Sequence, residues 1–126
     1  LVLLSGMFLV GCAGGPRDFA AGYHEALAAR PGVKMESWLD GRRAVSRFES
    51  LYGDLSPENV TANARKTYAP DAWFNDTIAT EIGIDAIEKY LLKTAEGTES
   101  VQAKVNDVAV SGADCYVRWT MVVRAK

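Results

Sequence analysis

One acidic residue, Asp76, lies in a stretch that is otherwise largely apolar and aromatic, which makes it the first candidate for chemistry. Residues 72–78 predict a strand, because Trp73 and Phe74 are typical strand residues. A carboxylate among such neighbours must be exposed, hydrogen-bonded or shifted in pKa. Two interpretations carry equal weight: Asp76 is a base in a pocket, or it caps the backbone of Ile78 or pairs with a neighbouring arginine.

Other residue types that carry chemistry are sparse. His24 is the only histidine, and it lies among Tyr23, Glu25 and alanines, so we expect a solvated surface histidine rather than a base. With this histidine and two cysteines, the sequence predicts no metal cluster, and we expect no cofactor. The formal net charge of −2 and the mixed placement of Lys and Arg exclude a basic face for nucleic acid.

The start of the chain resembles the lipobox of a bacterial lipoprotein signal peptide. Residues 1–10 are mostly apolar and lead into Gly11 and Cys12; a run of about 10 fits a signal peptide, whereas a bilayer span takes about 20. The resemblance implies cleavage before Cys12 and its lipidation, which would tie the protein to a periplasmic or extracellular membrane face of the cell envelope. The alternative is an ordinary secretory signal cut near Gly14 or Gly15.

The role expected of Cys115 depends on whether Cys12 is lipidated. If Cys12 is lipidated, we expect Cys115 to be a small buried hydrophobe on a strand. If Cys12 is a free thiol, a bridge to Cys115 is open in an oxidising compartment. Because the chain opens at Leu1 without a basic n-region and stops at Lys126 inside a strand pattern, we expect it to be truncated at both ends.

The sequence predicts one folded domain. Residues 1–12 are interpreted as the signal peptide and lipobox, residues 13–36 as a tether with a loose helix, and residues 37–126 as the domain. A chain of this length can enclose one core but not two.

Two helices are predicted at the start of the domain. Apolar and aromatic residues such as Phe48 recur every three or four positions over about residues 40–52, which marks one face of a helix. Ser56 then offers a cap and Pro57 fits a first helical position, so a second helix is expected to run to about Thr67.

A third helix and two long strands complete the pattern. Gly83 breaks the chain, Asp85 and Glu88 form a capping-box-like start, and Gly97 closes the helix. Alternating residues then predict two strands joined by a hairpin turn at residues 111–114, with a bulge where the phase shifts at residues 106–107. The last strand has one apolar face, expected to be buried, formed by Cys115, Val117, Trp119, Met121 and Val123.

From about Val45 to Val123 this order of elements is similar to the nuclear transport factor 2-like superfamily, which includes SnoaL-like polyketide cyclases and ketosteroid isomerases. Tyr68-Ala-Pro-Asp-Ala and Gly83-Ile-Asp-Ala-Ile resemble its motifs. The resemblance implies an α+β fold: a curved antiparallel sheet wrapped around three helices in a cone-shaped, cystatin-like barrel, with the last strands beyond Lys126. These motifs indicate the fold more than the function, because the superfamily holds enzymes, ligand binders and adaptors.

The resemblance also implies an apolar pocket inside the cone. It places Phe74 and Asp76 on the pocket side of the first strand, with Val117, Trp119 and Met121 lining the pocket from the later one. Core packing is an alternative role for Trp119 and Met121. Tyr68 ends the second helix, where its hydroxyl either reaches the pocket or its ring packs against the third helix.

In steroid isomerases of this superfamily, the acid that matches Asp76 is a general base. Their oxyanion-donor tyrosine falls on Phe48, which cannot donate, and Tyr52 lies one turn further on as a substitute. The loss of such a donor removes about 2.7 to 4 kcal/mol of barrier reduction, so steroid isomerase activity is not expected.

Three functions are open. The preferred one is a membrane-tethered binding domain whose apolar pocket holds a small apolar ligand, oriented by Asp76 or Tyr68. The second is a cofactor-free, isomerase- or cyclase-like enzyme in which Asp76 accepts a proton. The third is an envelope interaction module that forms a homodimer or binds a partner through the outer face of the sheet, its pocket filled by Phe48, Phe74 and Trp119.

Overall fold

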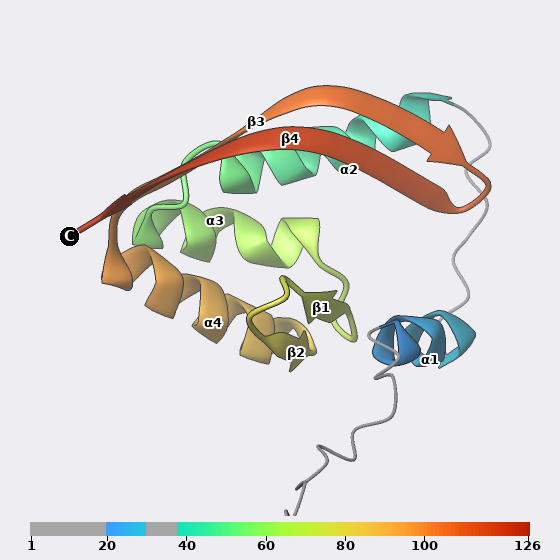
Figure 1. Cartoon of the computed structure of the whole chain (residues 1–126), viewed down its shortest axis with the longest axis horizontal. Coiled ribbons are helices and arrows are strands. Elements are labelled where there is room, and N and C mark those ends of the chain that lie inside the picture. The colour runs from blue at the N-terminus through green and yellow to red at the C-terminus, as the bar shows by residue number, and fades with distance from the viewer. Residues whose placement is uncertain (1–19, 30–37) are drawn as a thin grey trace, which may run out of the picture. The chain divides into compact units, whose positions relative to one another are not determined.

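The structure, a computed structural model, describes residues 20–29 and 38–126 (Figure 1). The chain divides into two compact units, Leu1–Pro31 and Gly32–Lys126. The described part of the first is helix α1 (Ala21–Ala29), in which no residue is buried and His24 is exposed, as predicted. Within the described ranges, no helix has the length and hydropathy needed to cross a bilayer. The predicted lipobox and Cys12 lie outside them.

The second unit confirms the predicted α+β class and the predicted order of elements. Its described strands form two separate antiparallel pairs, β1–β2 and β3–β4, and do not close into a barrel. The cone-shaped wrapping of one sheet around the helices therefore stays a prediction. The elements are α2 (Trp38–Tyr52), α3 (Pro57–Thr67), β1 (Trp73–Asn75), β2 (Thr80–Ile82), α4 (Ile84–Gly97), β3 (Thr98–Ser111) and β4 (Asp114–Ala125).

The core of this unit lies where three helices meet strand β3. Helix α3 packs against both α2 and α4, and β3 packs on α2 and α4 (Figure 1). The backbone N–H of Leu55 donates to the carbonyl of Val101 at 2.9 Å, which ties the α2–α3 loop to β3. The most completely buried side chains come from all these elements and include Leu51, Val60, Ala64, Ile87, Leu91 and Val101.

The start of α3 is the one that the sequence predicts. Ser56 is the N-cap, its hydroxyl accepts from the backbone N–H of Asn59 at 3.3 Å, and Pro57 begins the helix. The side-chain amide of Asn59 also donates to the carbonyls of Leu51 and Asp54, at 3.0 and 2.6 Å. The bond to Leu51 satisfies a carbonyl in the last turn of α2 that the helix itself leaves free, and the bond to Asp54 holds the loop that follows.

The predicted capping box of α4 is wrong. The helix begins at Ile84, so Gly83 is the N-cap, with φ +83° and no side-chain cap. Asp85 and Glu88 instead accept from the guanidinium of Arg65 at 2.7 and 2.6 Å, which joins α4 to α3. The helix start falls two residues earlier than a capping box of Asp85 and Glu88 requires, because glycine can take this positive φ.

The long hairpin β3–β4 has the predicted turn and bulge. Val105 pairs with Trp119 and Asp107 with Arg118, which leaves Asn106 as the extra residue. The turn between Ser111 and Asp114 begins at Gly112 with φ +61°. The residue types of this turn therefore set the register of β3 and β4.

The prediction that the apolar face of β4 is buried is wrong. Trp119, Met121 and Val123 are 38%, 47% and 54% exposed, and Cys115 is only half-buried. Both strands of this two-stranded sheet are edge strands, and the difference in burial arises because α2 packs mainly on β3. The alternation of faces holds, but the described helices cover β4 much less than they cover β3.

The core assignment gives a test with matched chemistry. Ile87 is fully buried and Ile78 is 87% exposed. We expect Ile87→Ala to lower the free energy of unfolding by about 2 to 5 kcal/mol, and Ile78→Ala to change it by about 0.5 kcal/mol or less. Urea unfolding of both variants checks this, and equal losses would contradict the core assigned here.

Candidate functional site

Asp76 does not lie on a strand. Strand β1 ends at Asn75 and β2 begins at Thr80, so the predicted strand over residues 72–78 is interrupted by a turn. The backbone N–H of Asp76 donates to the carbonyl of Ala79 at 3.3 Å across this turn. Asn and Asp favour turns because their side chains bond to nearby backbone, and here they override the strand composition of their neighbours.

The carboxylate of Asp76 joins this turn to helix α4. Its Oδ1 accepts from the backbone N–H groups of Ile78 and Ala79 at 3.0 and 2.9 Å. Its Oδ2 accepts from the hydroxyl of Tyr90 at 2.5 Å. The predicted capping of Ile78 is thus confirmed, and the described part of the chain offers Asp76 no arginine partner.

Thr77, inside the same turn, has φ +75°. A threonine in the left-handed region costs about 1 to 3 kcal/mol and persists only where its surroundings hold it. Its backbone N–H donates to the side-chain oxygen of Asn75 at 3.0 Å, next to the bonds made by Asp76. The side chains of Asn75 and Asp76 therefore hold a strained turn.

The hydrogen bonds of Asp76 set its charge. Burial raises its pKa, but the bonds from Tyr90 and from the backbone of Ala79 and Ile78 together bring the pKa below the ordinary 3.8. The same bond raises the pKa of Tyr90 to about 12. At neutral pH Asp76 is therefore ionised and Tyr90 is a neutral donor to it.

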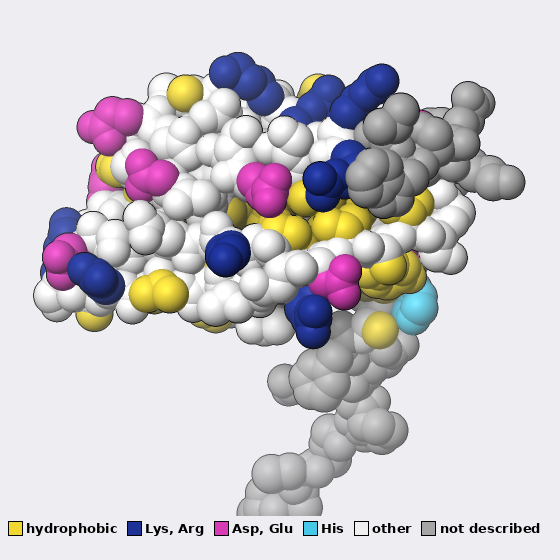
Figure 2. Space-filling view, turned by 90° about the horizontal axis from the view of Figure 1, so that it is seen from above, with side chains coloured by type: hydrophobic (Ala, Val, Ile, Leu, Met, Phe, Trp, Pro, Cys, Tyr) yellow, Lys and Arg dark blue, Asp and Glu magenta, His cyan; other side chains and the backbone are white. Residues whose placement is uncertain are grey.

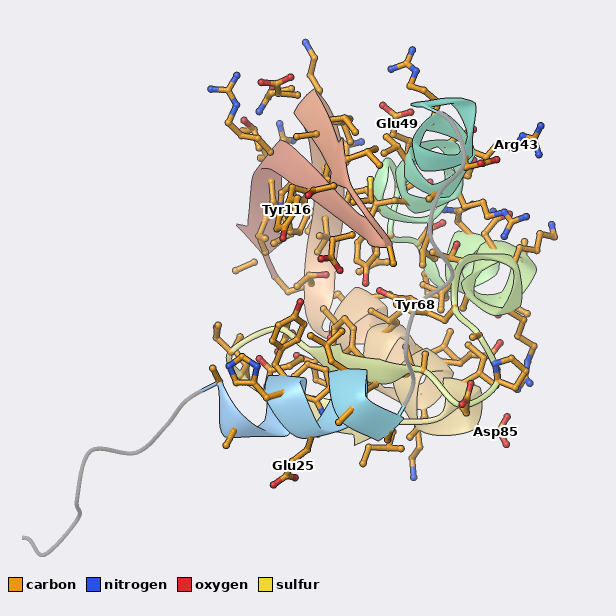
Figure 3. All side chains as sticks on the ribbon, turned by 90° about the vertical axis from the view of Figure 1, so that its right-hand side faces the viewer. Glu25, Arg43, Glu49, Tyr68, Asp85 and Tyr116 are labelled. Atoms are coloured by element: carbon orange, nitrogen blue, oxygen red, sulfur yellow. The ribbon has the colours of Figure 1, made fainter. Side chains whose placement is uncertain are left out.

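A pair of tyrosine hydroxyl groups lies near the Tyr90–Asp76 contact. The hydroxyls of Tyr52 and Tyr68 are 2.6 Å apart, and Tyr52 is only 7% exposed. Burial raises the pKa of both tyrosines, and the charge of Asp76 raises both further. Tyr68, at the C-cap of α3, lies on the inner side between the helices and the β3–β4 hairpin, whereas Arg43 and Asp85 point outward (Figure 3).

Aromatic rings connect the Tyr52–Tyr68 pair and the Tyr90–Asp76 pair to the β3–β4 hairpin. The ring of Phe48 stacks on Tyr52 with centroids 4.6 Å apart and meets the edge of Trp119 at 5.1 Å. The ring of Phe74 lies 5.9 Å from Tyr68 and 5.7 Å from Tyr90. We call this set the aromatic arc: Phe48, Tyr52, Tyr68, Phe74, Tyr90 and Trp119.

The structure brings together most of the residues that the sequence singles out. Phe48, Tyr52, Tyr68, Phe74 and Trp119 belong to the aromatic arc, and Asp76 is bonded to its end at Tyr90.

Two predicted residues lie outside the arc. Met121 is on the same face of β4 as Trp119 but largely exposed. Val117 instead lines a separate open hollow of about 410 Å³ on the hairpin, with Asp107 and Tyr116 among its neighbours.

Sequence reasoning missed the role of Tyr90. Its place three residues after Ile87 marks it as part of the apolar face of α4, and its hydroxyl is the polar group on that face. A buried or half-buried tyrosine hydroxyl usually has a partner, which was the available signal. The partner lies 14 residues away in sequence, so spacing alone did not identify it.

Comparison of the chain with protein-family models, curated proteins and solved structures finds no match. The superfamily resemblance therefore rests on the order of the elements and on the sequence motifs, and function must be argued from the side chains.

The hydroxyl pair of Tyr52 and Tyr68 can be tested by a double-mutant cycle. Each single change to Phe leaves one hydroxyl without its partner, at a cost of about 1 to 3 kcal/mol of unfolding free energy. The double variant removes both hydroxyls, so we expect it to lose less than the sum of the single losses. Tyr116→Phe, at an exposed ring, is the control. Additive losses in urea unfolding would show that the pair does not interact.

The lowered pKa of Asp76 predicts a pH dependence of stability. A carboxylate whose pKa is lower in the folded state stabilises that state above its unfolded pKa, about 3.9, and the gain disappears as pH falls through the folded pKa. Asp76→Asn should thus lower the unfolding free energy most at neutral pH, with the difference from wild type shrinking below about pH 4. Thermal unfolding from pH 7 to 2 measures this, and a difference that does not vary with pH would contradict it.

Proposed function

We propose that this protein is a SnoaL-like small-molecule binding domain, held at a membrane face by a lipid on Cys12. Its pocket, in this proposal, lies on the inner side of a sheet wrapped around the helices, as in the superfamily that the sequence resembles. The aromatic arc forms the wall, and Asp76 with the tyrosine hydroxyls orients the ligand. The observation that carries the proposal is the joining of five elements by these rings around a few polar groups.

The arc has the composition of a ligand site. Small-molecule sites are mostly apolar and aromatic with a few fixed polar groups, and the arc combines six aromatic side chains with the hydrogen-bonded Asp76. Trp119 is 38% exposed and the other rings outside Tyr52 are half-buried. Hydrophobic side chains also gather in a patch on the face seen in Figure 2.

The charge of Asp76 favours binding over proton transfer. A general base works best when its pKa lies near the working pH, and the hydrogen bonds of Asp76 move its pKa the other way. Its Oδ1 is already engaged by two backbone N–H groups. These features suit a fixed negative group that orients a ligand.

A binding assay tests the proposal. We expect the 126-residue chain to bind some members of a panel of lipids and steroids, with quenching of tryptophan fluorescence. Trp119→Leu should weaken that binding about tenfold, because burial of an aromatic ring contributes strongly to a binding site. Val122→Ala, on the opposite face of β4, is the control. No binding across the panel would contradict the proposal.

An acid–base enzyme is the second candidate, and the hydrogen bond from Tyr90 to Asp76 favours it. That pair places a proton donor beside a proton acceptor, which a cyclase- or isomerase-like reaction needs. Asp76→Asn separates the two functions. Turnover lost with ligand binding intact would support the enzyme, whereas binding without turnover in wild type supports the binding domain.

The lipid anchor has its own test. Mass spectrometry of the N-terminal peptide from the membrane fraction should show an acylated Cys12. A cleaved peptide that begins after Gly14 or Gly15 without lipid would show an ordinary secretory signal instead.

A further inference from the structure

The ring of Phe74 has a second carboxylate beside it. Phe74 and Glu81 are cross-strand partners in the β1–β2 pair, so their side chains are on the same face of the hairpin. The charge of Glu81 also contributes to the raised pKa of Tyr90, as Asp76 does. The rings of Phe74 and Tyr90 thus lie near two acidic side chains.

Neither carboxylate is neutralised by a basic side chain of the described ranges, in which Asp76 and Glu81 form no ion pair. The Oδ2 atom of Asp76 accepts one bond, from Tyr90, and a carboxylate oxygen has about two acceptor positions. The hydroxyl proton of Tyr90 is directed at Asp76, so it is not offered to a ligand. This end of the arc therefore holds carboxylate acceptors beside two half-buried aromatic rings.

Two carboxylates beside two aromatic rings match the cationic end of an organic ligand. The faces of aromatic rings carry partial negative charge and attract organic cations, which bind in aromatic cages beside carboxylates. A metal ion is a poorer match, because the described residues contain no group of three or more acidic, histidine or cysteine side chains suited to it. An anionic ligand end would be repelled by both acids.

We propose that the end of the aromatic arc formed by Phe74, Tyr90, Asp76 and Glu81 binds the cationic end of an apolar organic amine or quaternary ammonium compound. The inference rests on the proposed binding function and names its ligand class. The apolar body of the ligand lies along Tyr68, Tyr52 and Trp119, and the cation lies against the ring faces next to Asp76. Charge complementarity selects this ligand over a neutral one of the same shape.

A pair of probes with the same shape tests the charge. Benzyltrimethylammonium and neopentylbenzene differ in having nitrogen or carbon at the branching atom, and hence in charge alone. We expect the ammonium to bind the 126-residue chain about tenfold more tightly or better, as followed by shifts of the tyrosine ring signals in NMR at equal concentrations within the solubility of the hydrocarbon. Benzoate, an anion of similar size, should bind more weakly than either.

Two variants locate the cation. Asp76→Asn and Glu81→Gln should each remove most of the preference for the ammonium over the hydrocarbon, measured as the ratio of the two affinities in the same variant. Glu99→Gln, which removes the same charge from an exposed position on β3, should retain the preference. If Asp76→Asn does not fold, Glu81→Gln and Phe74→Leu decide, since Phe74→Leu keeps an apolar side chain and removes one ring face.

The outcomes separate this inference from the proposed function. Equal binding of both probes, or a preference for the ammonium that survives both acid changes, overturns the inference while the binding function stands. Binding of neutral lipids or steroids with none of the ammonium overturns it in the same way. Failure of the probes and of the whole panel overturns both.

Discussion

The bond from the hydroxyl of Tyr90 to the carboxylate of Asp76 is the contact on which the candidate site depends. Hairpins of two short strands are marginal by themselves, and β1 and β2 have three residues each, joined through a turn that contains a strained Thr77. Asp76 caps that turn from within, and Tyr90 ties it to α4. The same contact fixes the ring of Tyr90 against Phe74 and keeps the carboxylate ionised. One hydrogen bond therefore links local backbone geometry, aromatic packing and charge.

The β3–β4 hairpin positions the other end of the aromatic arc, and it does so through its register. Its register is set by the two-residue turn and by the bulge at Asn106, and this register puts Trp119 over Phe48 and Tyr52. Because helix α2 covers β3 and little of β4, the apolar face of β4 stays largely open. Where edge strands expose apolar side chains, they are available for contact with ligands or partners. The arc thus has a structured end at Tyr90 and an exposed end at Trp119.

Much of the fold was predictable because its signals are local. The cap at Ser56, the turn at Gly112 and the bulge at Asn106 each follow from residue types a few positions apart, and each is present. Burial of β4 was not predictable, because alternation shows which side chains share a face but not whether another element covers it. The candidate site was only partly predictable, because sequence shows residue types but not which side chains pack together. Aromatic residues and Asp76 stand out by type, whereas the partner Tyr90 and the sharing of Arg65 by Asp85 and Glu88 arise only from packing.

We propose that Asp76 is a fixed, ionised group that orients a ligand and does not accept a proton from it. The most direct test of this proposal is the titration of the Asp76 carboxyl carbon by ¹³C NMR in the 126-residue chain, compared with the same titration in Tyr90→Phe. The account predicts a wild-type pKa below the ordinary 3.8 and a higher pKa in the variant, since the variant loses the bond from the hydroxyl. A wild-type pKa raised toward neutrality, or one that does not change in Tyr90→Phe, would contradict it.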